Sequence, residues 1–281
     1  MRQLETIQEV VNYIENHLSK KLDLTEIAGA VFYSKHYLHR TFSQTVGLTI
    51  HDYLQRRQLT EAAKLLVFSN QPILEIALLA GYESQQAFTA VFSAMYKQTP
   101  RQFRVREKFY PLQLKFQFEG SYPMLTRKPA QKWQVDFACD ADIPCWMELV
   151  RLIVDGFPHL DEAQYGRTLR EKIRTRQALI LKDGETAVGV LLFSYETGSI
   201  EFMGAHPLYR QKGVPKALLD KVMGELTRGK EISITTYRQG DKADTGYRRE
   251  ILGLGFAEAE LLVEYGYPTQ RFVLPKEGRH E

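Results

Sequence analysis

The sequence has few cysteines, no long apolar run and little net charge, and each of these absences excludes a class of protein. Its 281 residues include only two cysteines, Cys139 and Cys145, without a CxxC spacing or paired histidines. We therefore expect neither a disulfide framework nor a zinc site, and no other metal is indicated. No apolar stretch approaches the roughly 18 residues that span a membrane, and the N-terminus lacks the apolar core of a signal peptide. A cytoplasmic protein without a membrane partner is expected.

The formal net charge is +3, and it is unevenly placed along the chain. Residues 1–108 hold 13 of the 37 lysines and arginines but 10 of the 34 acidic residues, so the whole excess lies in this part. Such a small excess favours contact with nucleic-acid phosphates only weakly. The length of the chain and its hydrophobic content of 44% predict packed cores in about two domains.

A helical pattern occurs twice in the first 104 residues. Leu24-Thr25-Glu26-Ile27-Ala28 precedes a helix that begins after Ser34, and Ile73-Leu74-Glu75-Ile76-Ala77 precedes one that begins after Ser84. In both copies the serine is a candidate N-cap, and apolar residues four and eight positions later bury one face of the helix. A short helix, a tight turn and a second helix with an exposed polar face are a helix-turn-helix, whose second helix fits the DNA major groove. The repeat therefore predicts a domain that reads two successive groove segments.

Further helical periodicity surrounds the repeat. It covers residues 4–18 and 50–66, and Pro100 can open a short final helix through Phe103. Three proline dipeptides interrupt residues 109–131, while residues 112–118 alternate between apolar and polar side chains as a strand does. We expect an ordered connector there.

The residues of the repeat resemble those of the AraC/XylS family of bacterial transcription regulators, and most of all its Mar/Sox/Rob branch, over residues 7–104. The matching stretches are Tyr33-Ser34-Lys35, Leu38, Arg40, Phe42, Gly47, Pro72-Ile73-Leu74, Glu83-Ser84-Gln85-Gln86, Phe92 and Thr99-Pro100. An ordered match of this length is far more specific than one short motif. The resemblance implies a regulator that binds double-stranded promoter DNA and activates transcription through RNA polymerase.

The resemblance also implies which side chains face the bases. They are His36, His39 and Arg40 in the first helix and Gln85, Gln86 and Thr89 in the second. Arginine suits guanine O6 and N7, and glutamine suits adenine N6 and N7. The alternative for each residue is a solvated helix face, and for the histidines the two interpretations have equal support.

Three positions depart from the family pattern. Close relatives have tryptophan where this chain has His36 and arginine where it has Ala90, so we expect a different DNA sequence to be read. Lys97 replaces a glycine that commonly ends the helix, which we interpret as a local change.

Strand patterns alternate with helical ones after residue 131. The expected strands cover residues 135–139, 178–181, 187–195, 200–205, 232–236, 261–263 and 270–274. The expected helices cover residues 143–154 and 160–174, a stretch that follows the loop at His206 and runs to Leu226, and a stretch that ends near Gly255. This order predicts an α+β domain with a mixed sheet.

The order of elements resembles that of the GNAT family of acyl-CoA-dependent N-acetyltransferases over residues 132–276. The family's Arg/Gln-x-x-Gly-x-Gly/Ala turn is matched by Arg210-Gln211-Lys212-Gly213-Val214 and broken at Pro215. In such a turn the free amides of a helix N-terminus hold the CoA pyrophosphate, and proline has no amide N–H. The resemblance implies a site for acetyl-CoA or CoA that includes Arg210, Gln211, Lys212, Gly213, Val214 and Lys216.

Two residues are candidates for catalysis. Glu201, on the strand before the turn, is the candidate base for an amine, and the alternative is an outward residue of an alternating strand. Many active GNAT members place a tyrosine acid four residues before the position of Gly255, where this chain has Ile251. Tyr247 lies one helical turn earlier and is either its substitute or a packing residue.

The sequence therefore predicts a multidomain protein with an all-α double helix-turn-helix domain at residues 1–108. A connector at 109–131 and an α+β GNAT-like domain with a mixed sheet at 132–276 follow. The leading hypothesis is a DNA-binding transcriptional regulator, an activator, whose C-terminal domain senses a small-molecule effector. A second is a bifunctional protein that also acetylates an amine with acetyl-CoA. The third is a GNAT-like domain that is purely structural or binds a partner.

Overall fold

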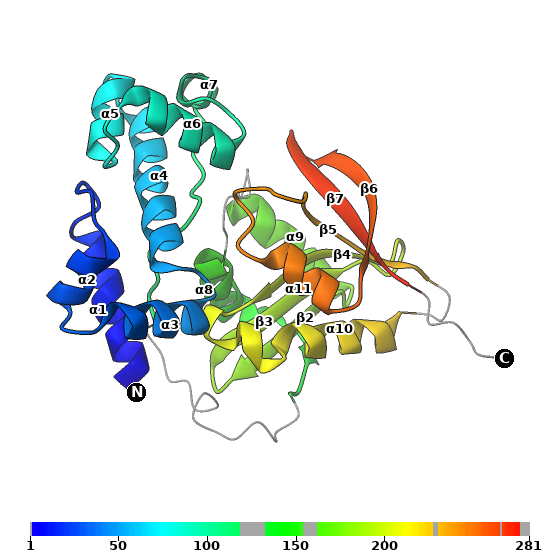
Figure 1. Ribbon diagram of the computed structural model, residues 1–281. Coiled ribbons are helices and arrows are strands. Elements are labelled where there is room, and N and C mark those ends of the chain that lie inside the picture. Colours follow the sequence, from blue (N-terminus) through cyan, green and yellow to red (C-terminus); the bar gives the residue numbers. More distant parts are fainter. Residues whose placement is uncertain (1, 119–132, 154–161, 227–229, 265, 276–281) are drawn as a thin grey trace. The chain divides into compact units, whose positions relative to one another are not determined.

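The computed structural model describes residues 2–118, 133–153, 162–226, 230–264 and 266–275. The chain divides into two compact units (Figure 1). Of the described residues, unit 1 contains 2–118 and 241–245, and unit 2 contains the others. The part of the expected connector from residue 119 onward and both ends of the expected GNAT-like domain lie outside the described residues. Within the described residues, no helix is long and apolar enough to cross a membrane.

Unit 1 is helical. Its helices are α1 (Arg2–Glu15), α2 (Leu24–Ala30), α3 (Lys35–Val46), α4 (Ile50–Phe68), α5 (Ile73–Leu79), α6 (Gln85–Tyr96) and α7 (Pro100–Arg106). α2 with α3 and α5 with α6 are two helix-turn-helix motifs, and the long helix α4 joins them (Figure 1). The prediction of an all-α first part with two such motifs is confirmed.

Aromatic side chains hold the second motif together. Phe92 stacks on Tyr96 with ring centroids 4.4 Å apart and meets Phe103 of α7 edge-on at 5.4 Å. Phe88, one turn before Phe92, is fully buried as well. Burial of a large apolar side chain contributes roughly 1.5–3 kcal/mol, so these rings fix α6 against α7.

The strand predicted over residues 112–118 is wrong. The segment has no ladder partner, and side chains of α4 bind its backbone instead. The N–H groups of Leu112 and Gln113 both donate to Thr60 Oγ1, at 3.0 and 3.1 Å, and Arg57 donates to the carbonyl of Gln113 at 2.9 Å. Buried backbone groups need hydrogen-bond partners, and here the side chains of a helix supply them.

Unit 2 is built on a seven-stranded sheet in the order β1-β2-β3-β4-β5-β7-β6. The strands are β1 (Asp136–Phe137), β2 (Ala178–Asp183), β3 (Thr186–Phe193), β4 (Ser199–Ala205), β5 (Ile232–Tyr237), β6 (Ala257–Glu264) and β7 (Tyr267–Leu274). β4 and β5 pair in parallel, and the other neighbours pair antiparallel. The predicted mixed sheet in an α+β second part is therefore confirmed.

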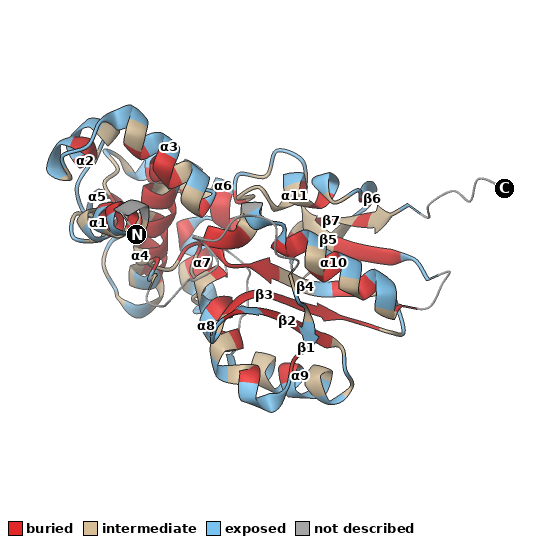
Figure 2. Ribbon diagram, turned by 90° about the horizontal axis from the view of Figure 1, so that it is seen from below, coloured by how far each residue is buried: buried red, intermediate tan, exposed pale blue. Residues whose placement is uncertain are grey.

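Helices cover both faces of this sheet. They are α8 (Ile143–Ile153), α9 (Glu162–Arg174), α10 (Val214–Glu225) and α11 (Tyr247–Gly253), with the 3-10 helices η2 (Asp140–Asp142) and η3 (Pro207–Lys212). The helix ends predicted at residues 154 and 160 lie outside the described residues. β3 is buried along almost its whole length, as expected for a strand covered on both faces (Figure 2).

Two glycines let helices approach the sheet closely. A Cβ on Gly189 would lie 2.4 Å from Val214 of α10, and a Cβ on Gly204 would lie 2.0 Å from Ile153 of α8. Gly204 is opposite Val190, the neighbour of Gly189, so the two glycines face opposite sides of the sheet. The first residue of α10 is thereby fixed directly on β3.

The parallel strands β4 and β5 separate midway. They pair only at Ser199 with Ser233 and at Ile200 with Ile234, although β4 continues to Ala205 and β5 to Tyr237. Toward their C-terminal ends, the facing edges of the two strands therefore do not pair with each other. The chain leaves β4 at this end into η3 and then α10.

Candidate nucleic-acid interface and ligand site

The two helices that follow the turns begin in the same way. Ser34 Oγ accepts a hydrogen bond from the N–H of Tyr37 at 3.3 Å, and Ser84 Oγ accepts one from the N–H of Ala87 at 3.2 Å. Each serine has an extended backbone, as an N-cap does. The serines therefore define the N-terminal ends of α3 and α6, which the sequence alone had indicated.

The turns before these helices also have the same hydrogen bonds. The N–H of Tyr33 donates to the carbonyl of Ala28, and the N–H of Tyr82 donates to the carbonyl of Ala77, at 3.1 and 3.0 Å. The residue before each tyrosine is left-handed, Phe32 with φ +58° and Gly81 with φ +79°. The two motifs thus share one backbone geometry although their turn residues differ.

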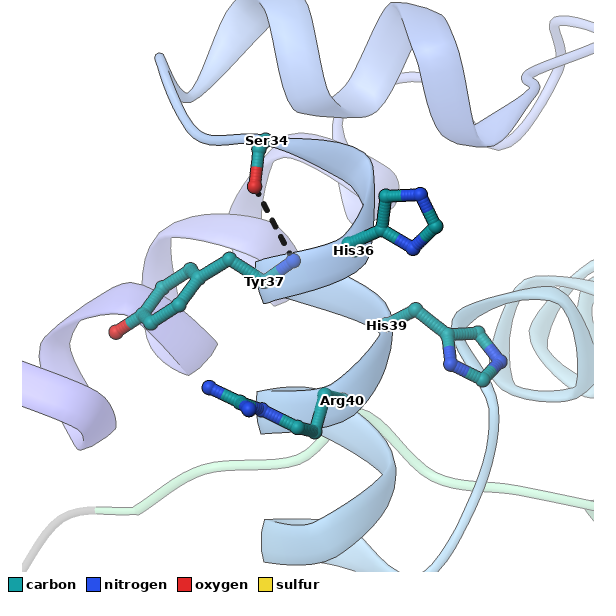
Figure 3. A pocket seen from close by; sticks show the side chains of 5 residues that line it. All are labelled: Ser34, His36, Tyr37, His39 and Arg40. Atoms are coloured by element: carbon teal, nitrogen blue, oxygen red, sulfur yellow. Dashed lines mark hydrogen bonds between the residues drawn. The ribbon is translucent and has the colours of Figure 1, made fainter.

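In α3 the predicted base-facing residues lie on the exposed side. His36, His39 and Arg40 are exposed, while Leu38 and Phe42 are buried beneath them. With Ser34 and Tyr37, the exposed residues line an open depression of about 500 Å³ at the N-terminal half of the helix (Figure 3). A hydrogen-bonding surface at the start of a helix is what base reading in a major groove requires.

α6 presents a similar surface. Gln85 and Gln86 are exposed in its first turn, Thr89 is half-buried one turn later, and Phe88 is buried. Ala90 is exposed, so the position where relatives have arginine faces solvent with a methyl group. The structure therefore places the six predicted residues three on each helix, and it does not bring the two sets into one cluster.

Tyr37 was missed by the sequence argument. Its ring stacks on that of Tyr33, with centroids 5.2 Å apart, and Tyr33 OH accepts a hydrogen bond from Thr6 of α1 at 3.1 Å. Tyr37 is half-buried and borders the same depression as Arg40. Its position three residues after the cap, on the same side as Arg40, was the available signal.

In unit 2 the predicted cofactor turn leads directly into α10. Gly213 has φ +80° and precedes the helix as its N-cap, without a side-chain cap, and Val214 and Pro215 are buried in the first turn. Pro215 has no N–H. This helix end can therefore offer an anion the N–H groups of Gly213, Val214 and Lys216. This helix start has one backbone donor fewer than a helix start without proline.

The side chains around the turn have other partners. Arg210 donates to Tyr247 OH at 3.0 Å, and its guanidinium lies 4.9 Å above the tyrosine ring. Trp133 Nε1 donates to the carbonyl of Lys212 at 2.6 Å. Lys216 forms an exposed ion pair with Asp220 at 3.1 Å. Gln211 lies in η3, and its side chain is outside the described part of the chain.

Both catalytic candidates are engaged inside unit 2. Glu201 Oε1 lies 2.6 Å from Lys172 Nζ of α9, and this lysine also donates to the carbonyl of Phe193. Tyr247 OH donates to the carbonyl of Ile153 at 3.4 Å besides accepting from Arg210. The Glu201 carboxylate is therefore held by Lys172, and a phenol directed at a backbone carbonyl is not directed at a substrate.

Two titratable groups, the buried His206 and the half-buried Glu250, lie near Arg210. Burial, with a smaller contribution from the Arg210 charge, lowers the pKa of His206 to about 3, so its imidazole is neutral. Its Nδ1 accepts a hydrogen bond from the N–H of Leu208 at 3.2 Å, which caps η3. Burial raises the pKa of Glu250 above its usual value, and the Arg210 charge opposes this shift. His206 therefore has a structural place in the loop.

Comparison with known proteins agrees with the geometry of unit 1. A helix-turn-helix domain family matches residues 27–106, and the two capped helices define a protein of the helix-turn-helix class. More particularly, the chain belongs to the AraC-type family of transcriptional regulators. The regulatory protein SoxS of Escherichia coli K12 is 36% identical over 106 residues, which cover 99% of SoxS and 38% of this chain.

Two further similarities are more limited. The uncharacterized HTH-type transcriptional regulator YbfP of Bacillus subtilis is 35% identical over 100 residues, which cover 36% of this chain. Only 34% of the length of YbfP is spanned. A GNAT-family acetyltransferase structure from Bacillus cereus is 13% identical with a TM-score of 0.40, and the likeness covers 51% of this chain and 96% of that one.

Proposed function

We propose that the protein is a sequence-specific DNA-binding activator of transcription in which α3 and α6 read the bases. One observation carries the proposal: two serine-capped helices in unit 1 present exposed hydrogen-bonding side chains at their N-terminal ends. The N-terminal residues of a recognition helix are those that reach base edges in the major groove. Membership in the AraC-type family supports the same function.

The residue types suggest a role for each helix. Arg40 can donate two hydrogen bonds to guanine O6 and N7, and Gln85 and Gln86 can each pair with adenine N6 and N7. His36 and His39 can bond to bases or to phosphates beside them. Lysine and arginine contacts to phosphates make the affinity of such proteins fall steeply with salt. We propose RNA polymerase as the protein partner that the DNA-bound regulator recruits, as the family membership suggests.

In vitro selection with the full chain tests DNA reading. A randomised duplex pool incubated with the protein should yield one asymmetric sequence with two selected segments. Their centres should be roughly 10 base pairs apart, one turn of the duplex, because two helices in one domain would enter successive major grooves. A pool that shows no enrichment after repeated rounds contradicts base reading, and the protein would then bind DNA only through phosphates.

The second part of the proposal is that unit 2 senses an acyl-CoA or another phosphate-bearing effector. The supporting observation is the separation of β4 from β5 at the end where the chain passes through η3 into α10. Ligands of sheets with parallel strands bind beyond the carboxyl ends of those strands, and a helix N-terminus attracts phosphate. The groups available to CoA are the N–H groups of Gly213, Val214 and Lys216 and the ammonium groups of Lys212 and Lys216. CoA would supply a pyrophosphate for the helix end and an amide-containing arm for the open strand edges.

Sensing is favoured over acetyl transfer because both catalytic candidates are engaged. Glu201 is ion-paired with Lys172, and Tyr247 bonds to Arg210 and to a backbone carbonyl. The alternative of a bifunctional regulator and N-acetyltransferase predicts acetyl transfer from acetyl-CoA to amines such as a polyamine or a protein lysine. The alternative of a structural or partner-binding unit 2 predicts no CoA binding.

Calorimetry on the full chain separates these three functions. We expect weak but measurable heat with CoA, and Pro215→Ala should tighten binding about tenfold because it restores one amide donor to a charged acceptor. Pro207→Ala restores an amide at the start of η3 instead, and it should leave CoA affinity unchanged. Absence of heat at millimolar CoA in both wild type and Pro215→Ala would remove the cofactor proposal. Acetyl-CoA turnover that depends on added amine would favour the bifunctional alternative.

Control of DNA binding by the effector is measurable as a coupling free energy. A ligand shifts DNA affinity only if it binds the DNA-bound and free protein with different affinity. A coupling of about 1–3 kcal/mol would change DNA affinity some 5- to 150-fold. Titration of the selected duplex with and without saturating CoA tests this, and equal affinities would contradict allosteric control of binding by CoA.

A further inference from the structure

Three segments of unit 1 meet at one side chain in the middle of α4. Gln58 Nε2 donates to the carbonyls of Leu18 and Lys20, at 3.0 and 3.3 Å. A Cβ on Gly81 would lie 2.8 Å from the same Nε2 and 3.4 Å from the Lys20 carbonyl. The chain after α1, the helix α4 and the turn of the second motif are therefore packed together around this amide.

An ion pair joins the same two segments beside the amide. Lys21 Nζ lies 2.6 Å from Glu83 Oε1, with both side chains mostly exposed. The hydrogen bond and charge of Lys21 lower the pKa of Glu83, and those of Glu83 raise the pKa of Lys21. Exposed pairs contribute little alone, so the Gln58 amide is the stronger part of the contact. We call Lys21, Gln58, Gly81 and Glu83 the inter-motif clamp.

The clamp lies directly before the helices of both motifs. Lys21 is two residues before Asp23, which caps α2 and accepts a hydrogen bond from the N–H of Glu26 at 2.8 Å. Glu83 is one residue before Ser84, the cap of α6. The clamp therefore connects the entry of the first motif to the entry of the second recognition helix, across more than 60 positions of sequence.

The corresponding residue of the first motif is not packed in this way. Phe32 has the position that corresponds to Gly81, and its side chain is 93% exposed. A packed turn is therefore not a requirement of this helix-turn-helix geometry. The glycine at position 81 matters for another reason: any larger residue would push against the Gln58 amide.

We propose that the inter-motif clamp sets the distance between the two recognition helices and thereby the base-pair spacing that the protein accepts between its two DNA segments. Gln58 is the positioning residue and touches no DNA in this role. The inference rests on the proposed reading of two segments by α3 and α6. α4 is the helix that joins the two motifs, and a single helix by itself lets the motifs tilt and bend relative to each other. The clamp adds a second connection near the middle of α4 and removes that freedom. A rigid pair of helices accepts one spacing, whereas a loose pair accepts several, because successive grooves are separated by one turn of the duplex.

The test uses the full chain and three duplexes. These are the in vitro-selected sequence and two derivatives with one base pair inserted or deleted between the two selected segments. Fluorescence anisotropy gives the dissociation constant of each protein for each duplex. We define the spacing ratio as the dissociation constant for an altered duplex divided by that for the selected duplex. Gln58→Ala and Gln58→Met, the second of which keeps the aliphatic bulk, should lower this ratio about tenfold relative to wild type, which corresponds to about 1.4 kcal/mol. Gln55→Ala, one turn earlier on the same helix and equally half-buried, should keep the wild-type ratio.

The outcomes separate the clamp from DNA reading itself. A wild-type protein that selects a sequence and rejects altered spacings, together with unchanged ratios in folded Gln58→Ala and Gln58→Met, would overturn the clamp alone. An equal loss of affinity on all three duplexes would also overturn it, because that loss reports general destabilisation. Failure of wild type to select any sequence would overturn both proposals. Since Lys21 and Glu83 are exposed, Glu83→Lys is a variant expected to fold in any case, and it too should lower the ratio, though less than the Gln58 variants.

Discussion

Phe32 has the same backbone position in the first helix-turn-helix as Gly81 has in the second. The N–H of Phe32 donates to the carbonyl of Gly29 and that of Gly81 to the carbonyl of Leu78, and both residues have positive φ. A left-handed conformation costs an L-residue roughly 1–2 kcal/mol, and glycine adopts it readily. Because the Phe32 side chain is 93% exposed, its packing does not offset this strain.

Replacement of Phe32 by glycine should therefore stabilise the protein. We expect Phe32→Gly to raise the free energy of unfolding by about 0.5–1 kcal/mol, since relief of strain exceeds the added freedom of the unfolded chain. Gly81→Ala should lower it by about 1 kcal/mol or more, because it adds both strain and a contact with Gln58. Urea unfolding followed by circular dichroism measures both. A less stable Phe32→Gly would show that the aromatic ring stabilises the turn.

Base reading predicts a loss that depends on the DNA sequence. Arg40→Ala and Gln85→Ala should each cost about 1–3 kcal/mol on the selected duplex and little on a scrambled duplex of the same length. Gln44→Ala provides the control, because Gln44 is exposed on α3 but lies outside the depression that Arg40 borders. Competition binding at two salt concentrations measures these differences. Equal losses on both duplexes would mean that Arg40 and Gln85 contact the backbone of DNA and not its bases.

A buried ion pair should control the stability of unit 1. Arg57 Nε lies 2.8 Å from Glu15 Oε1, with side chains 7% and 12% exposed. Glu15→Ala leaves the buried Arg57 guanidinium with the carboxylate of Glu61, which is 3.0 Å away and 41% exposed, so the loss of the Glu15 hydrogen bonds should lower the free energy of unfolding by about 1.5–3 kcal/mol. Glu171→Ala breaks the exposed pair with Arg174 and should change the free energy of unfolding little. Denaturant unfolding compares the two, and a small effect of Glu15→Ala would show that Glu61 or water replaces the lost partner of Arg57.

His206 should make stability depend on pH in the acid range. Its pKa is lowered to about 3 by burial and by Arg210, below the ordinary value of 6.5. Between these values the unfolded chain binds a proton that the folded chain does not, so this contribution to stability is complete above about pH 6.5 and declines as the pH falls. His206→Asn keeps an acceptor for the N–H of Leu208 and does not titrate. Relative to the variant, wild type should lose up to about 1.4 kcal/mol per pH unit between pH 6 and 4.

The control for this dependence is the pH range well above 6.5. There the curves of the two proteins should run parallel, because His206 is neutral in both the folded and the unfolded chain. Parallel curves for wild type and His206→Asn between pH 6 and 4 would contradict a buried neutral imidazole at position 206.

Local signals determined much of this protein. The N-caps Ser34 and Ser84 and the apolar positions after them specify α3 and α6 within about ten residues of chain, so their hydrogen bonds could be anticipated from sequence. The same spacing decided which side chains are exposed on each helix. In the second part, short apolar or alternating stretches predicted the strands of the described sheet, although β6 and β7 begin before the predicted residues, because burial of one or both faces acts through near neighbours.

Only the tertiary structure decided what depends on partners distant in sequence. Residues 112–118 alternate like a strand, yet Thr60 and Arg57 of α4 bind their backbone, and no local pattern reports such partners. From sequence, Glu201 was a candidate base and Tyr247 a candidate acid. In the structure Glu201 is ion-paired with Lys172, and Tyr247 accepts a hydrogen bond from Arg210. Gln58 had no signal at all, because its role follows from two carbonyls and a glycine on other segments. Sequence periodicity records which face of an element is buried, whereas polar side chains are assigned to their partners only when the chain has folded.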